Sequence, residues 1–377
     1  SGSNTRCAKD GGAVKAGGGA TMKFLRTTFQ DWKGYSGGVI DVDNAILQVT
    51  DSTFKSNYAD EKGGAIQISG TQTAIVITEA TFIGNEAVFG GAISIDSFAS
   101  MQMFHTDALG NLANGGDGGF IFSRFALPIL LYYVNIQKST TDKDGGGGAI
   151  AMYSTQFALY EVEIKQCQAG EKGGGAILMD GEAEGHLFSV IMEDNTAEFD
   201  GGHIYLAASS LIVHDKGSSL KWPDREPLFI RIWDLTASKA TIFFGGMSSS
   251  SGGSISCVGS KSDQVLAQYK NKADGSACQS NLYMFRLNIN GSEMYACPDK
   301  GVFLGRETKI HNSTAAKSGG SISANLCAIE MHNVSIVNGI SKNGNGGAVL
   351  LSSTSTLHVD KMSRFESNTA AHGSGGA

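Results

Sequence analysis

One short motif recurs along the chain, and it limits the possible folds more than any other feature. It consists of a Phe, an Asn three positions later, an Ala two positions after that, and then a Gly-Gly pair followed by Ala. Its complete copies contain Phe54, Asn57, Gly63 and Gly64, then Phe82, Asn85, Gly90 and Gly91, and finally Phe365 and Asn368 before the last Gly pair. Further pairs include Gly147 and Gly148, Gly174 and Gly175, and Gly346 and Gly347.

The Gly pairs recur at a nearly fixed period. Most of the intervals between successive pairs are 26 to 29 residues long. The two longer intervals, of 51 and 67 residues, are interpreted as two periods each, the second with an insertion of roughly a dozen residues. The chain is therefore expected to contain about fourteen units of about 27 residues, a pattern typical of a solenoid.

Each unit carries three short runs rich in Ile, Val, Thr and Phe, in which apolar residues alternate with polar ones. Such runs are strands rather than helices. Because few two-residue turns join them, we expect each unit to form one turn of a parallel β-helix, with every strand paired to its equivalent in the next turn. At a rise of ~4.8 Å per turn, the fourteen turns would form a rod about 65 Å long.

The motif residues have clear expected roles in such a turn. The Gly pair lies at a corner, where a positive φ or the close passage of the next turn excludes a Cβ atom. The Phe side chains stack from turn to turn as an internal ladder. The Asn side chain caps a corner by hydrogen bonding to the backbone of its own or the next turn. Because the Gly pairs recur with the repeat, they are interpreted as structural corners rather than as phosphate-binding loops.

Composition narrows the function. Gly accounts for 51 of 377 residues, but Pro for only 4, and the low Pro content argues against a disordered linker or collagen. The net charge of −7 argues against nucleic acid as a partner. The longest apolar run, 125–134, is shorter than the ~20 residues of a membrane-spanning helix, so no membrane span is expected. Residues 1–377 are interpreted as one domain and as a segment of a longer chain, because the sequence lacks an initiator Met and stops within a repeat.

Two stretches break the pattern and are expected to be lateral loops, 217–228 and 257–300. The first contains Trp222 and two Pro, and with Phe229 and Trp233 it would form either a contact surface or ordinary packing under a loop. The second carries three of the six Cys. Cys297 and Cys327 lie about one turn apart and would be within disulfide reach, and Cys257 would pair with Cys278; free buried thiols are the alternative.

The remaining polar motifs are few. Three N-glycosylation sequons, at Asn290, Asn312 and Asn333, suggest a glycosylated face. The acidic turns at Asp117 and at Asp142 to Asp144 have Ca²⁺-ligand chemistry but are interpreted as polar turns.

Two histidines beside Gly pairs, His203 and His372, are interpreted as corner or surface residues. A glycosidase would need paired carboxylates beside them, and the sequence shows no such pair. We therefore expect no catalytic residue, no metal and no cofactor.

The complete motifs, from Phe54 to Gly64, from Phe82 to Gly91 and from Phe365 onward, resemble the repeats of the polymorphic outer-membrane protein family, best known as chlamydial autotransporter adhesins. Similar repeats occur in large surface proteins of protists. The resemblance implies a right-handed parallel β-helix of the pectate-lyase-like superfamily and a secreted or surface setting.

The expected function is that of a non-enzymatic extracellular structural protein, a β-helical block of a cell-surface filament or appendage. Its partners would be other copies of itself or related surface proteins, and covalent glycans would decorate it. An adhesin that binds a host or matrix ligand is the alternative, and a polysaccharide lyase or hydrolase is the third possibility. The first two share the fold and differ in partner.

Overall fold

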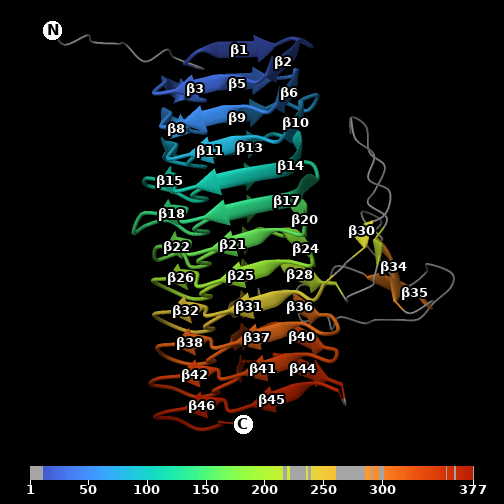
Figure 1. Ribbon diagram of the computed structural model, residues 1–377. Helices are drawn as coiled ribbons and strands as arrows, with labels where there is room; N and C mark the ends of the chain where they lie inside the picture. Colours follow the sequence, from blue (N-terminus) through green and yellow to red (C-terminus); the bar gives the residue numbers. More distant parts are fainter. Residues whose placement is uncertain are drawn as a thin grey trace.

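The computed structural model is a solenoid of short strands stacked along one axis (Figure 1). The structure describes residues 12–214, 219–220, 235–236, 239–259, 285–289, 292–296, 301–353, 355–360 and 362–376. All regular elements in these ranges are strands. The strands form three columns, which we call the first, second and third sheets in the order in which each turn visits them, and every pairing within a column is parallel. The predicted parallel β-helix is therefore confirmed.

The first sheet follows the Gly pairs. Its strands are β1 (Val14–Gly17), β5 (Ile40–Asp43), β9 (Ile66–Ser69), β13 (Ile93–Asp96), β16 (Ile121–Arg124), β19 (Ile150–Tyr153), β23 (Ile177–Asp180), β27 (Ile204–Ala207), β33 (Ile255–Val258), β39 (Ile322–Asn325) and β43 (Val349–Ser352).

The second sheet receives two stretches of strand from each turn. The upstream strands are β2 (Thr21–Leu25), β6 (Ile46–Thr50), β10 (Ala74–Thr78), β20 (Gln156–Tyr160), β24 (Glu184–Phe188), β28 (Ser210–Val213), β36 (Gly301–Leu304), β40 (Ala328–Met331) and β44 (Thr356–Val359). The downstream strands are β3 (Thr28–Gln30), β7 (Thr53–Lys55), β11 (Thr81–Ile83), β21 (Glu163–Lys165), β25 (Ile191–Glu193), β31 (Ile242–Phe244), β37 (Lys309–His311), β41 (Ser335–Val337) and β45 (Arg364–Glu366). In two turns one long strand replaces both, namely β14 (Ser100–Leu109) and β17 (Ile129–Gln137).

The third sheet precedes the Gly pairs and has the shortest strands. They are β4 (Lys33–Ser36), β8 (Tyr58–Lys62), β12 (Glu86–Ala87), β15 (Leu112–Ala113), β18 (Thr140–Thr141), β22 (Gln168–Ala169), β26 (Thr196–Ala197), β32 (Met247–Ser248), β38 (Thr314–Ala315), β42 (Ile340–Ser341) and β46 (Thr369–Ala370).

The predicted number of turns is wrong. The first and third sheets have eleven strands each, which define about ten complete turns instead of fourteen. The error comes from the two long intervals, because β27 pairs directly with β33, and β33 pairs directly with β39. Each long interval is therefore one turn with a lateral excursion, and the stacked rod is about 50 Å long at ~4.8 Å per turn.

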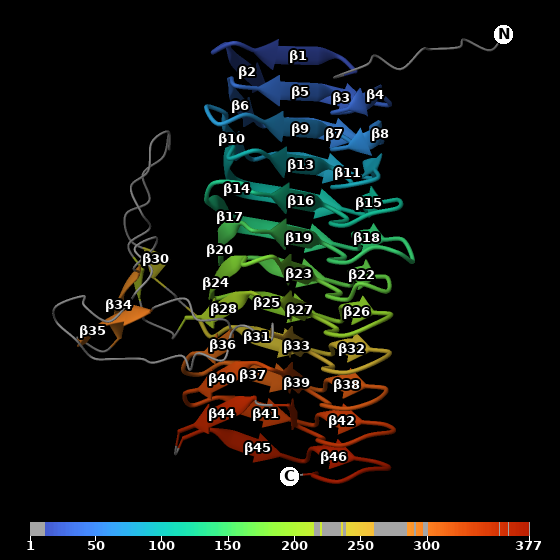
Figure 2. The same ribbon diagram turned by 180° about the vertical axis from the view of Figure 1, so that it is seen from behind.

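The two excursions meet beside the rod (Figures 1 and 2). The first excursion lies between β28 and β31, both in the second sheet. The second excursion lies in the next turn, between β33 of the first sheet and β36 of the second sheet. The first excursion supplies β29 (Ser219–Leu220) and β30 (Leu235–Thr236), and the second supplies β34 (Phe285–Ile289) and β35 (Ser292–Ala296). These four strands pair antiparallel, and β29 joins the two excursions by pairing with β34. Trp222, Phe229 and Trp233 lie outside the described residues.

Apolar side chains fill the inside of the solenoid. Phe29, Phe54 and Phe82 stack on three successive turns, with ring centroids 5.1 and 4.8 Å apart. The next turn has Ala108 at this position, and the Phe120 ring, which follows the neighbouring Gly pair, packs against Phe82 instead at 5.6 Å. The predicted aromatic ladder therefore spans three turns, because a small and a large residue then exchange positions and keep the interior filled.

Candidate functional site

Backbone geometry requires glycine at both positions of the Gly pair. Gly63 has a φ of +61°, a conformation that disfavours any residue with a Cβ atom. Gly64 has no such restriction, but a Cβ atom there would lie 2.2 Å from the carbonyl oxygen of Gly91 in the next turn. The two expected reasons for glycine, positive φ and close passage, are thus both present, one on each residue of the pair. The first glycines of the other pairs share the positive φ; they are Gly90, Gly147, Gly174 and Gly346.

The motif Asn forms a hydrogen-bonded ladder inside the corner. The Asn85 Nδ2 atom donates to the backbone oxygen of Phe54 and to Asn111 Oδ1, at 3.0 Å each. The Asn85 Oδ1 atom accepts from the backbone N–H of Asn57 at 3.1 Å and from Asn57 Nδ2 at 2.9 Å. One side chain therefore satisfies two backbone groups of the preceding turn and is itself fully buried.

The ladder is interrupted where the motif degenerates. Asn195 and Asn368 still make both hydrogen bonds to the backbone of the preceding turn, accepting from an N–H group and donating to a carbonyl oxygen. The intervening turns place smaller residues at this position, among them Ser139, Cys167 and Gly246. Cys167 is a buried free thiol whose pKa is raised to about 12 by burial. A thiol held neutral in this way is a packing residue rather than a nucleophile.

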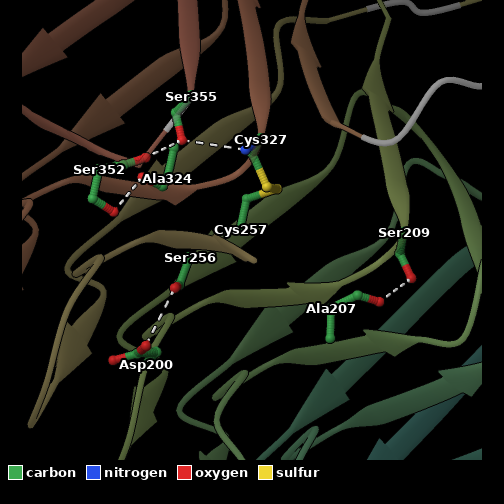
Figure 3. The surroundings of a disulfide bond; sticks show 9 residues. All are labelled: Asp200, Ala207, Ser209, Ser256, Cys257, Ala324, Cys327, Ser352 and Ser355. Atoms are coloured by element: carbon green, nitrogen blue, oxygen red, sulfur yellow. Dashed lines mark hydrogen bonds between the residues drawn. A yellow bond between two sulfur atoms is a disulfide. The ribbon is translucent and has the colours of Figure 1, made fainter. Parts of the chain in front are cut away.

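The disulfide connects different cysteines from those predicted. Cys257 in β33 bonds to Cys327, which immediately precedes β40, with their Cα atoms 6.2 Å apart (Figure 3). The proposed pairings of Cys257 with Cys278 and of Cys297 with Cys327 are therefore wrong. The two cysteines lie in neighbouring turns. They are 70 residues apart in the sequence because the second excursion is inserted between them. Cys278 and Cys297 lie outside the described residues.

Two of the three sequon asparagines lie on described corners. Asn312 is exposed, with a φ of +56°, and its Oδ1 atom accepts from Asn338 Nδ2 at 3.0 Å. Asn333 is half-buried in the next turn, with a φ of +49°. Asn312 directly follows β37, and Asn333 lies two residues before β41. Asn290 lies outside the described residues.

The two histidines beside Gly pairs have different environments. His203 is completely buried, accepts a hydrogen bond from Asn195 Nδ2 at 3.0 Å and lies 6.0 Å from the Phe243 ring. Burial lowers the pKa of His203 to about 3. The surface position considered for His203 is therefore wrong, since it occupies the interior position that is Ala65 or Ala92 in other turns. His372 is exposed.

The two acidic turns lie on successive turns of the solenoid, and in the described residues they do not build a metal site. Asp117 is buried and bound by Lys172 Nζ at 2.9 and 3.0 Å, by the Tyr153 hydroxyl at 2.7 Å and by the Gly146 N–H at 2.9 Å. An ammonium group therefore already neutralises its charge. Within the described ranges, no three His, Cys, Asp or Glu side chains are placed to hold a metal ion.

Two groups of acidic and basic side chains that the sequence does not show lie on the sheets. Asp96 pairs with Lys62 Nζ at 2.8 Å and with Arg124 Nε at 3.2 Å on the first sheet. On the second sheet, Lys165 Nζ lies 2.9 Å from Glu163 and 3.3 Å from Glu193. The sequence could not show these groups, because their members come from different turns. In the first group one carboxylate contacts two cations, and in the second one cation contacts two carboxylates, so both groups are ion pairs.

One buried polar cluster was missed by the sequence reasoning. Glu184 Oε1 lies 3.0 Å from His186 Nε2, and His186 Nδ1 lies 2.9 Å from His214 Nε2. All three side chains are nearly inaccessible. The pKa of His214 is lowered, first by burial and second by the neighbouring His186. The signal that could have revealed this cluster is the Glu-x-His pattern of Glu184 and His186, because side chains two residues apart on a strand lie on the same face.

Both ends of the described solenoid expose its interior. At one end, Met22 and Phe24 point inward but remain half-exposed, and at the other end so do Leu357, Val359 and Phe365. Their equivalents inside the rod, such as Phe54, are completely buried. Within the described residues, β43, β45 and β46 each have a strand partner on one side only.

The structure contains no described helix long and apolar enough to cross a membrane. The sequence matches no protein-family model, and comparisons with curated proteins and with solved structures found no match either. The likeness to polymorphic outer-membrane repeats therefore stays a prediction.

Proposed function

We propose that this protein is a non-enzymatic, extracellular structural element, a β-helical block of a cell-surface filament or appendage. The observation that carries the proposal is the open interior at both ends of the described solenoid. Half-exposed Phe24 and Phe365 belong to rows that are completely buried elsewhere. Unpaired strand edges and an exposed apolar interior both favour the addition of further coils.

The added coils would come from the same protein or from a neighbouring molecule. A contact between one end and the opposite end of another copy is heterologous, and such contacts build open filaments when the rotation does not close a ring. The main-chain groups at β43, β45 and β46 would then pair as they do between internal turns.

Two features support an extracellular setting. The Cys257–Cys327 disulfide is of a kind that persists in oxidising compartments and is rare in the cytosol. The sequon residue Asn312 is exposed on a corner, where a glycan would not disturb the packed interior. We propose that Asn312 and Asn333 carry glycans, which intact mass before and after enzymatic deglycosylation would test.

Assembly can be tested with a pair of matched substitutions. Leu357→Lys places a charge in an interior row at the open end, and Leu109→Lys places one on the outer side of β14, where Leu109 is already exposed. We expect sedimentation to show that Leu357→Lys abolishes assembly and that Leu109→Lys does not. Equal assembly of both variants would contradict end-to-end growth.

An adhesin is the second candidate, supported by the lateral sheet of β29, β30, β34 and β35. In repeat proteins, insertions from successive repeats gather on one face, which is often the binding face. Saturable binding of a non-assembling rod to cells, lost when the lateral sheet is deleted, would favour this function. Hydrolysis or lyase activity on an acidic polysaccharide would favour the third candidate, for which the Asp96 and Asp117 ion-pair groups are the starting residues.

A further inference from the structure

Three tyrosines gather on the outer side of the second sheet. Tyr132 in β17 and Tyr160 in β20 occupy the same position in successive turns. Their rings are parallel within 6°, with centroids 4.5 Å apart. The Tyr133 ring lies across both, with centroids 4.6 Å from Tyr132 and 6.0 Å from Tyr160. In the described part of the chain, no other two tyrosine rings are in contact.

Tyr133 connects this cluster to solvent at a conformational cost. It is 40% exposed and has a φ of +53°, and the left-handed conformation costs roughly 1–2 kcal/mol for a residue with a side chain. The same corner in other turns holds Asp51, Glu79 or Glu161. His105 shares the conformation and stacks on Tyr133 at 5.1 Å and 8°. Bulky residues kept in this conformation are often functional.

The Glu161 carboxylate lies beside the phenols. Burial raises the pKa of Tyr132, Tyr133 and Tyr160, and the negative charge of Glu161 raises all three further. The phenols are therefore neutral near pH 7, so removing an electron from one of them must also release a proton. Glu161 is the carboxylate whose charge acts on all three phenols, so we assign it as the acceptor of that proton. Lys239 Nζ is 3.9 Å from the same carboxylate.

We propose that Tyr132 and Tyr160 form an oxidative cross-linking site, at which a peroxidase using hydrogen peroxide creates a dityrosine bond between two turns of the rod. The proposal does not depend on the filament function. The oxidant takes an electron from exposed Tyr133, and the hydroxyl proton moves to Glu161. Tyr132 then reduces the Tyr133 radical by giving up its electron and hydroxyl proton.

A second oxidation removes an electron and the hydroxyl proton from Tyr160 and leaves a radical there. This proton, the proton held by Glu161 and the two electrons removed are all taken up in the reduction of the peroxide to water. The two radicals couple through ring carbons next to the hydroxyl-bearing carbons, and the hydrogen on each joined carbon moves to the oxygen, which restores both phenols. Overall, the protein loses two hydrogen atoms, and hydrogen peroxide with those two hydrogens becomes two water molecules. The product covalently joins β17 to β20.

Peptide mapping can locate the bond. Trypsin places Tyr132 and Tyr133 in peptide 125–138 and Tyr160 in peptide 144–165, which also contains Tyr153. After treatment of the whole protein with peroxidase and hydrogen peroxide, we expect monomer that has lost two hydrogens, dityrosine fluorescence and a linked pair of these peptides. Tyr160→Phe and Tyr132→Phe should abolish the linked pair, and Tyr133→Phe should slow its formation several-fold.

Phe retains the ring, so these variants keep the packing, which circular dichroism would verify. Tyr35→Phe is the matched control, because Tyr35 is 48% exposed but lies outside the cluster, and it should leave the linked pair unchanged. An undiminished linked pair in Tyr160→Phe would overturn the proposal. Dityrosine found only in cross-linked dimers, or no dityrosine at all, would overturn it as well.

Discussion

Replacing Asn85 by Ala tests whether the asparagine ladder holds the turns together. The substitution removes the acceptor for both the backbone N–H and the side-chain Nδ2 of Asn57, and the donor to the Phe54 carbonyl. All of these groups are buried. A buried polar group left without its partner costs about 1–3 kcal/mol, so loss of at least two such groups should lower the free energy of unfolding by about 3–5 kcal/mol.

The assay is urea unfolding of the purified protein, followed by far-UV circular dichroism. Asn114→Ala is the matched control, because exposed Asn114 donates one bond of 3.0 Å to Glu86 on the surface, and it should change stability by less than about 0.5 kcal/mol. Native-state hydrogen exchange would show whether the loss centres on the turns of Asn57 and Asn111. If Asn85→Ala and Asn114→Ala have equal effects, the ladder is not a stabilising element.

Three further substitutions test other parts of the account. Gly64→Ala should lower the free energy of unfolding by more than about 3 kcal/mol or prevent folding, because the added Cβ atom meets the Gly91 oxygen at 2.2 Å. Gly84→Ala is the control, because Gly84 has a φ of +57° but open space around it. In the same urea assay it should cost about 1 kcal/mol. Cys327→Ser should lower the free energy of unfolding by about 2–4 kcal/mol, and added reductant should then have no further effect; an unchanged urea midpoint would contradict a role for the bond. His203 has a folded-state pKa of about 3, below its unfolded value of about 6.5, so its contribution to stability is complete above pH 6.5 and is lost as pH falls, by about 2 kcal/mol at pH 5. His203→Ala should remove this part of the pH dependence of the melting temperature, and an unchanged pH profile would count against the assignment.

The repeat predicted the fold well because each motif residue acts within one turn of its neighbours. The positive φ of Gly63 and the cap of Asn85 follow from local geometry that recurs at a fixed spacing. The number of turns could not be predicted from the sequence. A loop inserted into one turn and a second turn that has lost its Gly pair both lengthen the interval between Gly pairs in the same way. The pairings of β27 with β33 and of β33 with β39 distinguish them.

The same reason explains the errors at the candidate sites. Sequence separation measures distance along the chain, whereas the solenoid brings together residues one turn apart, whatever is inserted between them. Cys257 and Cys327 are 70 residues apart and bonded. The ion pairs of Asp96 and the stacked rings of Tyr132 and Tyr160 likewise depend on the register between turns, which the motif fixes only approximately.

The most direct test of the structural proposal is electron microscopy of the native, unconcentrated protein, with electron diffraction along any fibre axis. The account predicts fibres in which the strand spacing of ~4.8 Å continues through the junctions between rods, because the open edges at β43 and β46 pair as internal strands do. Isolated rods about 50 Å long, with both ends free at every concentration, would contradict it.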